Sequence, residues 1–153
     1  MATRATAAKP APAPKPAAVT LTAKEIMQTP VIAATPRASL RDLAARLVTN
    51  EFSGMPVADP DGRVIGVITE ADIIRALLEG KHIENLTASQ VMTGPALTVD
   101  VTTPLEEVMK ILQEHKIVRV PVTSDDKLVG IVARRDVIRA VIEPEFMVFR
   151  EPL

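Results

Sequence analysis

Apolar residues that follow Ser39 return every three or four positions, which is the spacing of one face of a helix. That face is formed by Leu40, Leu43, Ala44, Leu47 and Val48. Ser39 and Asp42 have the spacing of a capping box and predict where the helix begins. A second stretch of this kind follows Thr103 and Pro104, which suit the N-cap and the first helical position. Its apolar face is formed by Leu105, Val108, Met109 and Leu112.

Two pairs of short β-branched runs, each separated by turn residues, predict β-hairpins. The first pair, GMPVA and RVIGVI, flanks DPDG, and the second pair, VRVPVT and KLVGIVA, flanks SDDK. A further helix is predicted after each hairpin, over residues 71–78 and 135–142, and we expect Pro144 to end the latter. Each half of the chain therefore has the predicted order short strand, helix, strand, strand, helix.

The two halves are copies of one pattern. A shift of 65 residues aligns Met27 with Met92, Pro30 with Pro95, Leu40 with Leu105, Leu43 with Val108, Leu47 with Leu112, Pro56 with Pro121 and Val57 with Val122. After the hairpin turn the shift becomes 64, which aligns Gly66 with Gly130, Asp72 with Asp136, Ile73 with Val137, Leu77 with Val141 and Leu78 with Ile142. A one-residue change confined to a turn is what a duplicated fold tolerates. A half of about 60 residues buries too little surface to be stable alone, so we expect a pseudo-symmetric packed pair.

Composition agrees with a globular chain and narrows its chemistry. Of the 153 residues 47% are hydrophobic and 24% charged, but only 2% are aromatic, so the core is expected to be aliphatic. Few aromatic residues also means little stacking capacity for nucleobases. The absence of cysteine excludes disulfides, thiolate metal sites and thiol nucleophiles, and it suits the cytoplasmic location that we expect.

Charge is distributed unevenly between the two parts of the chain. Residues 1–24 hold four basic residues and no acidic one, which leaves fourteen basic against nineteen acidic residues, about −5, for the rest. Alternating alanine and proline in residues 1–21 favour a polyproline II tether over a targeting helix. No window approaches eighteen consecutive apolar residues, so no membrane span is expected. We expect the two copies to occupy residues 22–84 and 85–144, followed by an apolar tail over 145–153.

The chemically most informative motif is GVITEADI, residues 66–73, which returns as GIVARRDV at 130–137. A strand that ends before a helix leaves free backbone N–H groups at the junction, where anions and hydroxyl groups bind well. Thr69 and Asp72 at this junction can form a capping box without any ligand. However, Asp136 is kept in the second copy although Ala133 has replaced the threonine. A role for the aspartate beyond capping is therefore favoured, with helix polarity as the alternative.

The repeated order TxxPV, amphipathic helix, GMPVAD and GVITEAD, with TGPALTV, VRVPV and GIVARRD in the second copy, resembles a tandem pair of CBS domains over about residues 22–144. The resemblance implies an α+β fold of two pseudo-symmetric β-α-β-β-α modules packed through their small sheets. It also implies clefts for AMP, ADP, ATP or S-adenosylmethionine, and dimerisation through the helices. In such modules the aspartate binds the ribose hydroxyls, and the hydroxyl residue three positions earlier helps to hold ribose or phosphate.

Position within the resemblance supplies the remaining candidate ligand-binding residues. Besides Thr69, Asp72, Arg134 and Asp136 they are Thr29, Val31, Ile32, Ser53, Met55, Pro56, Thr93, Ala96, Leu97, Arg119, Val120 and Pro121. For the apolar members, packing in the core is the competing interpretation. Arg119 lies within an apolar strand, which is costly unless its guanidinium reaches water or an anion. We expect the Asp72 pocket to be the better nucleoside site, and Asp136 with Arg134 to form a phosphate-preferring or degenerate one.

No catalytic or metal-binding constellation is found in the sequence. His82 and His115 lie in different repeats without accompanying metal ligands, and neither a Ser-His-Asp set nor a glycine-rich phosphate loop is present. We therefore expect no enzyme and no metal site, but a regulatory module that senses an adenosine ligand and modulates a protein partner. A ligand-free interaction or dimerisation module is the alternative. The acidic body argues against nucleic acid, and wide apolar helix faces such as Ile73, Ile74, Leu77 and Leu78 favour a homodimer.

Overall fold

The computed structural model describes residues 21–149, and side-chain exposure through residue 143. The first repeat contains α3 (Leu40–Asn50), β1 (Gly54–Ala58), β2 (Val64–Thr69) and α4 (Glu70–Leu78). The second contains β3 (Val99–Asp100), α6 (Leu105–Glu114), β4 (Arg119–Ser124), β5 (Lys127–Ala133) and α7 (Arg134–Phe149). Three short helices precede or connect them: α2 (Ala23–Ile26), the 3-10 helix η1 (Ile83–Asn85) and α5 (Ala88–Val91). The predicted α+β fold with helices and hairpins in both repeats is confirmed.

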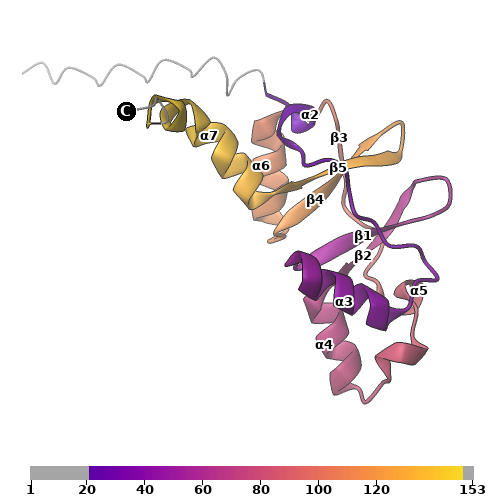
Figure 1. The fold of residues 1–153 in the computed structure, drawn as a ribbon. Helices are drawn as coiled ribbons and strands as arrows, with labels where there is room; N and C mark the ends of the chain where they lie inside the picture. The colour runs from indigo at the N-terminus through magenta and orange to yellow at the C-terminus, as the bar shows by residue number, and fades with distance from the viewer. Residues whose placement is uncertain (1–20, 150–153) are drawn as a thin grey trace, which may run out of the picture.

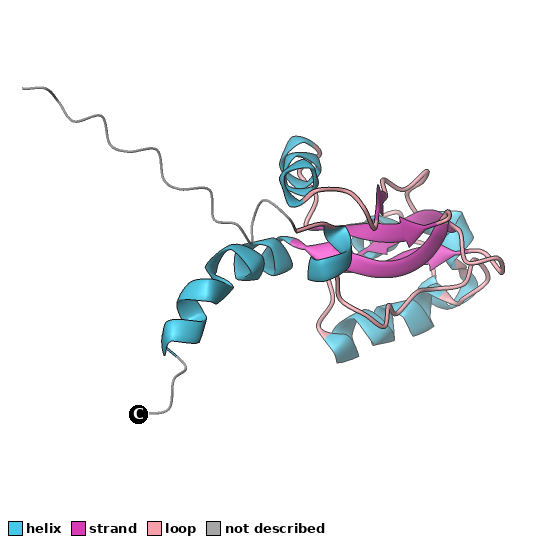
Figure 2. Ribbon diagram, turned by 90° about the horizontal axis from the view of Figure 1, so that it is seen from above, coloured by secondary structure: helices cyan, strands magenta, loops and turns pink. Residues whose placement is uncertain are grey.

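The strands of the two repeats lie between the helix pair α3 and α4 and the helix pair α6 and α7 (Figure 1). Within the described residues, β1 pairs with β2, and the second sheet has the order β3-β4-β5. In the first repeat, the expected short strand is a single parallel bridge, Ala34 to Val57. Its counterpart, β3, pairs in parallel with β4 at Val99 and Val122. Seen from above, the strands form a layer flanked by helices (Figure 2).

The segment that precedes each repeat packs on the other repeat. Ala23 and Ile26 of α2 lie in a core with Val99, Leu105, Val108, Leu112, Val120, Val122, Val132 and Val137. Ala88 of α5 lies in the core of the first repeat, with Leu40, Leu43, Leu47, Met55, Val57 and Ile68. Antiparallel bridges from Gln28 to Ile131 and from Thr93 to Val67 join these segments to the far hairpins. The two halves are therefore held together by exchanged segments as well as by their sheets.

The exchanged segments also satisfy the first N–H groups of the long helices. The amide of Leu40 donates to the carbonyl of Leu86 at 2.8 Å, and the amide of Leu105 donates to the carbonyl of Leu21 at 3.0 Å. Ser39 makes no side-chain capping bond within the described chain, so the predicted capping box is wrong, and α6 has Pro104 at its N-cap in place of Thr103. In both helices, a carbonyl from a distant segment accepts from the N–H of the first helical residue.

The short helices α2 and α5 were not predicted from the apolar pattern because each has only four residues. Their signal in the sequence is a capping box, Thr22 with Glu25 in α2 and Thr87 with Gln90 in α5. The prediction that Pro144 ends the last helix is also wrong, since α7 continues to Phe149. A proline removes one backbone donor and bends a helix without necessarily ending it. Residues 1–20 of the predicted leader, which was expected to run to residue 21, lie outside the described residues, and so do residues 150–153 of the predicted apolar tail and the side chains of residues 145–149.

Gly66 and Gly130 are required by the packing of the exchanged segments. A Cβ on Gly66 would lie 2.6 Å from Met92 Sδ and 3.0 Å from the carbonyl oxygen of Thr93, and one on Gly130 would lie 2.7 Å from Met27 Cγ. Each hairpin therefore accepts a methionine from the opposite segment only where its own strand lacks a side chain.

We predict that Gly66→Ala lowers the free energy of unfolding by about 1–3 kcal/mol, as overpacking does elsewhere. Urea denaturation of the single and double variants measures it. In the double variant Gly66→Ala with Met92→Ala, the loss should be smaller than the sum of the two single losses, since the added methyl group then has room. Additive losses would contradict this account of the glycine.

Candidate functional site

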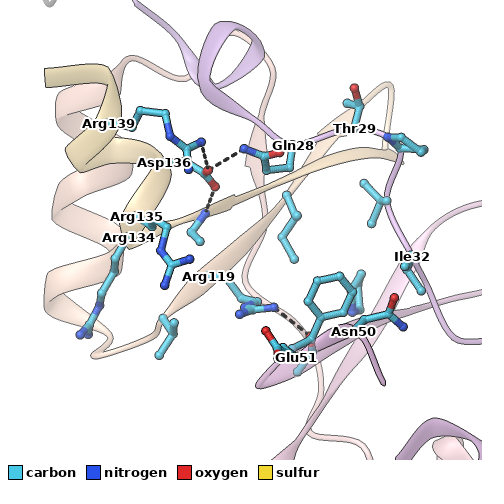
Figure 3. A pocket seen from close by; sticks show the side chains of 18 residues that line it. Gln28, Thr29, Ile32, Asn50, Glu51, Arg119, Arg134, Arg135, Asp136 and Arg139 are labelled. Atoms are coloured by element: carbon cyan, nitrogen blue, oxygen red, sulfur yellow. Dashed lines mark hydrogen bonds and ion pairs between the residues drawn. The ribbon is translucent and has the colours of Figure 1, made fainter. Parts of the chain in front are cut away.

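Two clefts lie at the junctions between the repeats. The first, here the Asp136 cleft, has a volume of about 700 Å³, and β5 and the start of α7 form one of its walls. It is lined by Gln28, Thr29, Pro30, Val31, Ile32, Asn50, Glu51, Phe52, Gly54, Pro56, Val118, Arg119, Ile131, Ala133, Arg134, Arg135, Asp136 and Arg139 (Figure 3). This volume lies within the range of small-molecule and cofactor sites.

The second cleft, here the Thr69 cleft, has a volume of about 510 Å³. Its lining is the pseudo-symmetric counterpart of the first: Ser53, Gly54, Val67, Thr69, Glu70, Ala71, Thr93, Pro95, Ala96, Leu97, Lys116, Ile117, Val118, Arg119 and Pro121. Each cleft is thus built from the strand–helix junction of one repeat and the leading segment of the other. Asp72 is not among the described residues that line the Thr69 cleft, although Asp136 lines its own.

The two junction aspartates are buried, with 2% exposure for Asp72 and 6% for Asp136. Asp136 Oδ1 accepts hydrogen bonds from Gln28 Nε2 at 2.7 Å and Arg139 Nη1 at 3.3 Å, and its Oδ2 accepts one from the backbone N of Ala133 at 2.8 Å (Figure 3). These bonds orient the carboxylate at the first turn of α7, where a negative charge is also favoured by the helix dipole.

Asp72 is held in the same manner but accepts one hydrogen bond more. Its Oδ1 accepts from Arg75 Nη1 at 3.2 Å and from Thr93 Oγ1 at 3.0 Å. Its Oδ2 accepts from the backbone N of Thr69 at 2.9 Å and from Thr69 Oγ1 at 3.0 Å. A carboxylate offers about four acceptor positions. The described residues therefore fill the positions of Asp72 and leave one open on Asp136.

The open position has a specific origin in the sequence. Thr69 Oγ1, the fourth donor to Asp72, has Ala133 as its counterpart, and alanine has no hydroxyl group to donate to Asp136. The replacement that suggested a weakened second site thus leaves the Asp136 carboxylate better able to accept a hydroxyl from a ligand. This open position and the lining of the clefts are the observations from which we propose, below, a ribose site in the Asp136 cleft in place of the Asp72 pocket expected from the sequence.

Arg119 lies between the clefts and lines both of them. Its Nη1 donates to the carbonyl oxygen of Gly54 at 3.2 Å, and its guanidinium carbon lies 5.7 Å from the centre of the Phe52 ring (Figure 3). Its Nε is buried and has no hydrogen-bond partner among the described residues. Burial lowers the pKa of Arg119 from its usual value, while Asp136 and Glu70 act in the opposite direction.

The counterpart of Arg119 in the first repeat is Gly54, and the difference is steric. A Cβ on Gly54 would lie 2.9 Å from the carbonyl oxygen of Ile68 and 3.2 Å from Thr69 Cγ2. The first repeat therefore has no room for a side chain at this position, and the arginine of the second repeat reaches the glycine's carbonyl instead. The two clefts therefore share one guanidinium, whereas a strictly symmetric pair would have one from each repeat.

The clefts differ strongly in charge. The Asp136 cleft is lined by four arginines, Arg119, Arg134, Arg135 and Arg139, against Glu51 and Asp136. In the Thr69 cleft the charged residues are Arg119, Lys116 and Glu70, and most of the remaining lining is aliphatic. Arg134 is partly engaged, because its Nε donates to the carbonyl of Ile117 at 3.0 Å. Arg135 extends from the first turn of α7 toward the Asp136 cleft (Figure 3).

Most of the sequence-predicted residues are brought together in the two clefts. Thr29, Val31, Ile32, Pro56, Arg119, Arg134 and Asp136 line the Asp136 cleft, and Ser53, Thr69, Thr93, Ala96, Leu97, Arg119 and Pro121 line the Thr69 cleft. The placement of Met55 and Val120 needs correction. They are buried in the cores and do not appear among the described lining residues, since alternate strand residues point to opposite faces.

Sequence reasoning missed several lining residues as ligand contacts. They include Gln28, Phe52, Lys116 and Arg139. The alignment of the repeats contained a signal for Gln28, because it is the counterpart of Thr93 at a spacing of 65. Arg139 lies three residues after Asp136, as Arg75 lies three residues after Asp72, which is the spacing of ion pairs on a helix.

Two further properties concern the described residues as a whole. Between residues 21 and 149, no group of three or more His, Cys, Asp and Glu side chains is placed to hold a metal ion. No helix in the same part of the chain is long and apolar enough to cross a membrane.

Comparison with solved structures places this architecture among known CBS pairs. CBSX2 in complex with AMP has a TM-score of 0.72 and 28% identity, covering 82% of this chain and 98% of that one. The CBS domain pair of protein MJ0100, in complex with 5′-methylthioadenosine and S-adenosyl-L-methionine, gives the same TM-score, identity and coverage. Hypoxic Response Protein I, solved with two coordinated zinc ions, has a TM-score of 0.72 and 29% identity over 77% of this chain and 97% of that one.

Comparison of sequences agrees with the structural result. Hypoxic response protein 1 of Mycobacterium tuberculosis is 30% identical over 129 residues, which cover 84% of this chain and 90% of that protein. The family model of the CBS domain matches residues 23–79 and 88–143. These two matches fall on the two repeats, each with its junction aspartate. The chain therefore belongs to the CBS domain family and contains a tandem pair of these domains.

Proposed function

We propose that this CBS pair is a regulatory sensor that binds an adenosine nucleotide in the Asp136 cleft and modulates a protein partner. The observation that carries this proposal is that one cleft contains a hydrogen-bond acceptor and a hydrogen-bond donor that both lack a partner among the described residues. Asp136 has an open acceptor position, and the buried Nε of Arg119 has no partner among the described residues. A ribose hydroxyl and a phosphate oxygen supply what these two groups lack.

The charge of the cleft supports a phosphorylated ligand. Arg119 and Arg135 line it, and guanidinium groups bind phosphate oxygens with short, charge-assisted hydrogen bonds. Phosphate binding also offsets the cost of keeping Arg119 half-buried, which is the cause of its lowered pKa. AMP is the adenosine nucleotide of this kind with the fewest phosphate groups, and ADP and ATP carry additional ones. The complexes of CBSX2 with AMP and of the MJ0100 pair with S-adenosyl-L-methionine support an adenosine ligand of this class.

We further propose that the chain acts as a homodimer joined through its helices. Ile74, Leu77 and Leu78 on α4 are 56%, 52% and 84% exposed, and Ile138 on α7 is 59% exposed. Apolar side chains at adjacent positions of one helix are costly to leave in water and are typical of an interface. A dimer can also have two arrangements of its subunits. A ligand shifts the equilibrium between them only if it binds one arrangement more tightly than the other.

The first prediction concerns AMP and the two aspartates. AMP at about a hundred times its dissociation constant should stabilise the chain by about 2.7 kcal/mol, or about 5–10 °C in dye-monitored thermal unfolding. Asp136→Asn should abolish most of this shift, because the amide replaces an acceptor by a donor. The matched variant Asp72→Asn should keep the shift relative to its own unliganded midpoint. Loss of the shift in Asp72→Asn alone would assign the ligand to the Thr69 cleft.

An absent shift with every adenosine ligand, in a wild-type chain that unfolds cooperatively, would favour the ligand-free interaction module. The ligands compared should be AMP, ADP, ATP and S-adenosylmethionine. The melting midpoint must be tested at two protein concentrations, because dimerisation alone makes it concentration-dependent.

A second prediction separates stability from binding at Arg119. Arg119→Met removes a buried donor that lacks a partner and keeps the aliphatic length of the side chain. The unliganded variant should be as stable as the wild type or about 1 kcal/mol more stable in urea denaturation. At an AMP concentration of about a hundred times the wild-type dissociation constant, its AMP-induced thermal shift should nevertheless fall by about half or more. A variant that is both destabilised and still able to bind AMP would show that Arg119 has a structural role only.

A third prediction concerns the dimer. Leu78→Glu should convert the chain to a monomer in light scattering coupled to gel filtration, because a charge cannot be buried in an apolar interface without a partner. Arg63→Glu, at an exposed position beside the first hairpin turn, is the control and should leave the molar mass unchanged. A wild-type monomer at the highest concentrations tested would refute the proposed dimer.

A further inference from the structure

We propose that Arg119 is shared by the two clefts, so that they cannot both bind a phosphorylated ligand tightly. The inference rests on the proposed function and adds that a nucleotide bound in one cleft weakens the binding of a nucleotide in the other. Arg119 lines the Asp136 cleft and the Thr69 cleft alike, with its guanidinium bonded to Gly54, a residue that lines both. Phosphate oxygens that accept from this one guanidinium would lie within roughly 8 Å of each other, since each hydrogen bond spans about 2.8 Å.

The hydrogen-bonding capacity of Arg119 is large, but its charge is single. A guanidinium has five N–H donors, and among the described residues one of them, on Nη1, is engaged with the carbonyl of Gly54. Donors therefore remain for either cleft. A phosphate that binds first, however, compensates the positive charge, and a second phosphate then meets a like charge at short range in a partly buried place.

The Thr69 cleft has little else with which to hold a phosphate. The counterpart of Arg119 is Gly54, where a Cβ would lie 2.9 Å from the carbonyl oxygen of Ile68. Glu70 and Ala71 stand where the Asp136 cleft has Arg134 and Arg135, and the cleft's other cation, Lys116, is solvent-exposed. A phosphorylated ligand in the Thr69 cleft thus depends on Arg119, whereas one in the Asp136 cleft also has Arg135.

The ligand's charge therefore decides how the clefts influence each other. A nucleotide in the Asp136 cleft should weaken nucleotide binding in the Thr69 cleft by at least about tenfold. It should leave the binding of an uncharged adenosine ligand there nearly unchanged, because such a ligand does not need the guanidinium. By linkage the effect is reciprocal. The pair would then hold one nucleotide at a time, with its second cleft open to a neutral nucleoside.

The experiment uses calorimetric titration of the full chain with AMP and with 5′-methylthioadenosine, which carries no phosphate. Two variants obstruct one cleft each: Ile32→Trp fills the Asp136 cleft and Ala71→Trp fills the Thr69 cleft, both at exposed positions. Each is then combined with Arg119→Ala. The matched control is Arg63→Ala, which removes an exposed arginine outside both linings.

We expect Arg119→Ala to weaken AMP binding about tenfold or more in both single-cleft variants and to change methylthioadenosine binding by less than twofold. In the wild type, the product of the two AMP association constants should be at least tenfold below the product of the single-cleft constants. For methylthioadenosine, the product of the two wild-type association constants should equal the product of the single-cleft constants. The wild type alone gives a check that needs no obstructing variant, since it should bind one AMP but two methylthioadenosine molecules in the same concentration range.

An AMP loss confined to one single-cleft variant, or two AMP molecules bound with the full single-cleft affinities, would overturn the sharing of Arg119 and leave the proposed function intact. Failure of the wild type to bind any adenosine ligand would instead overturn the proposed function itself. Retained methylthioadenosine binding in each obstructed variant shows that the variant is folded.

Discussion

The junction carboxylate of each repeat is held by the segment that leads into the other repeat, and the architecture follows from this exchange. Gln28 Nε2 lies 2.7 Å from Asp136 Oδ1, and Thr93 Oγ1 lies 3.0 Å from Asp72 Oδ1. A buried carboxylate requires such donors, because an unpaired buried charge is far more costly than the chain can tolerate. Neither repeat can satisfy its own aspartate in full, so each repeat completes the other. The clefts arise where these exchanged segments pass the strand–helix junctions.

Duplication gives two equivalent junctions, and substitutions make them unequal in hydrogen bonding and in charge. Ala133 in place of the threonine leaves an acceptor position open on Asp136, while Thr69 fills the same position on Asp72. Arg119 opposite Gly54 places a single cation between two clefts. The first change is small in volume, and the second places the much larger side chain of Arg119 in the lining of the clefts and not in either core. Function can therefore diverge between the clefts while the pseudo-symmetric fold is kept.

Much of the fold was predictable because its signals are local or repeat at a fixed spacing. The helix faces, the hairpin turns and the alignment of the two repeats require only neighbouring residues and one shift along the chain. The exchange of α2 and α5 was not predictable in this way, since it depends on the carbonyls of Leu21 and Leu86 reaching helices of the opposite module. The same limit applies to the aspartates. Their sequence context is nearly equal, but their hydrogen bonds come partly from residues 21 and 108 positions away.

The burial of Arg119 has a cost in stability, and this cost supports the proposed phosphorylated ligand. Burial lowers its pKa, and its buried Nε has no partner among the described residues, so the chain keeps a cation in a place where burial penalises its charge. Lysine would serve a surface role equally well, and methionine would pack at lower cost. Under the proposed function, an arginine here would gain most from an anion in the cleft, because such a ligand supplies a compensating charge and a hydrogen-bond acceptor for Nε. Under the proposed function, a phosphorylated ligand would offset the cost of burying Arg119, and a neutral ligand would not.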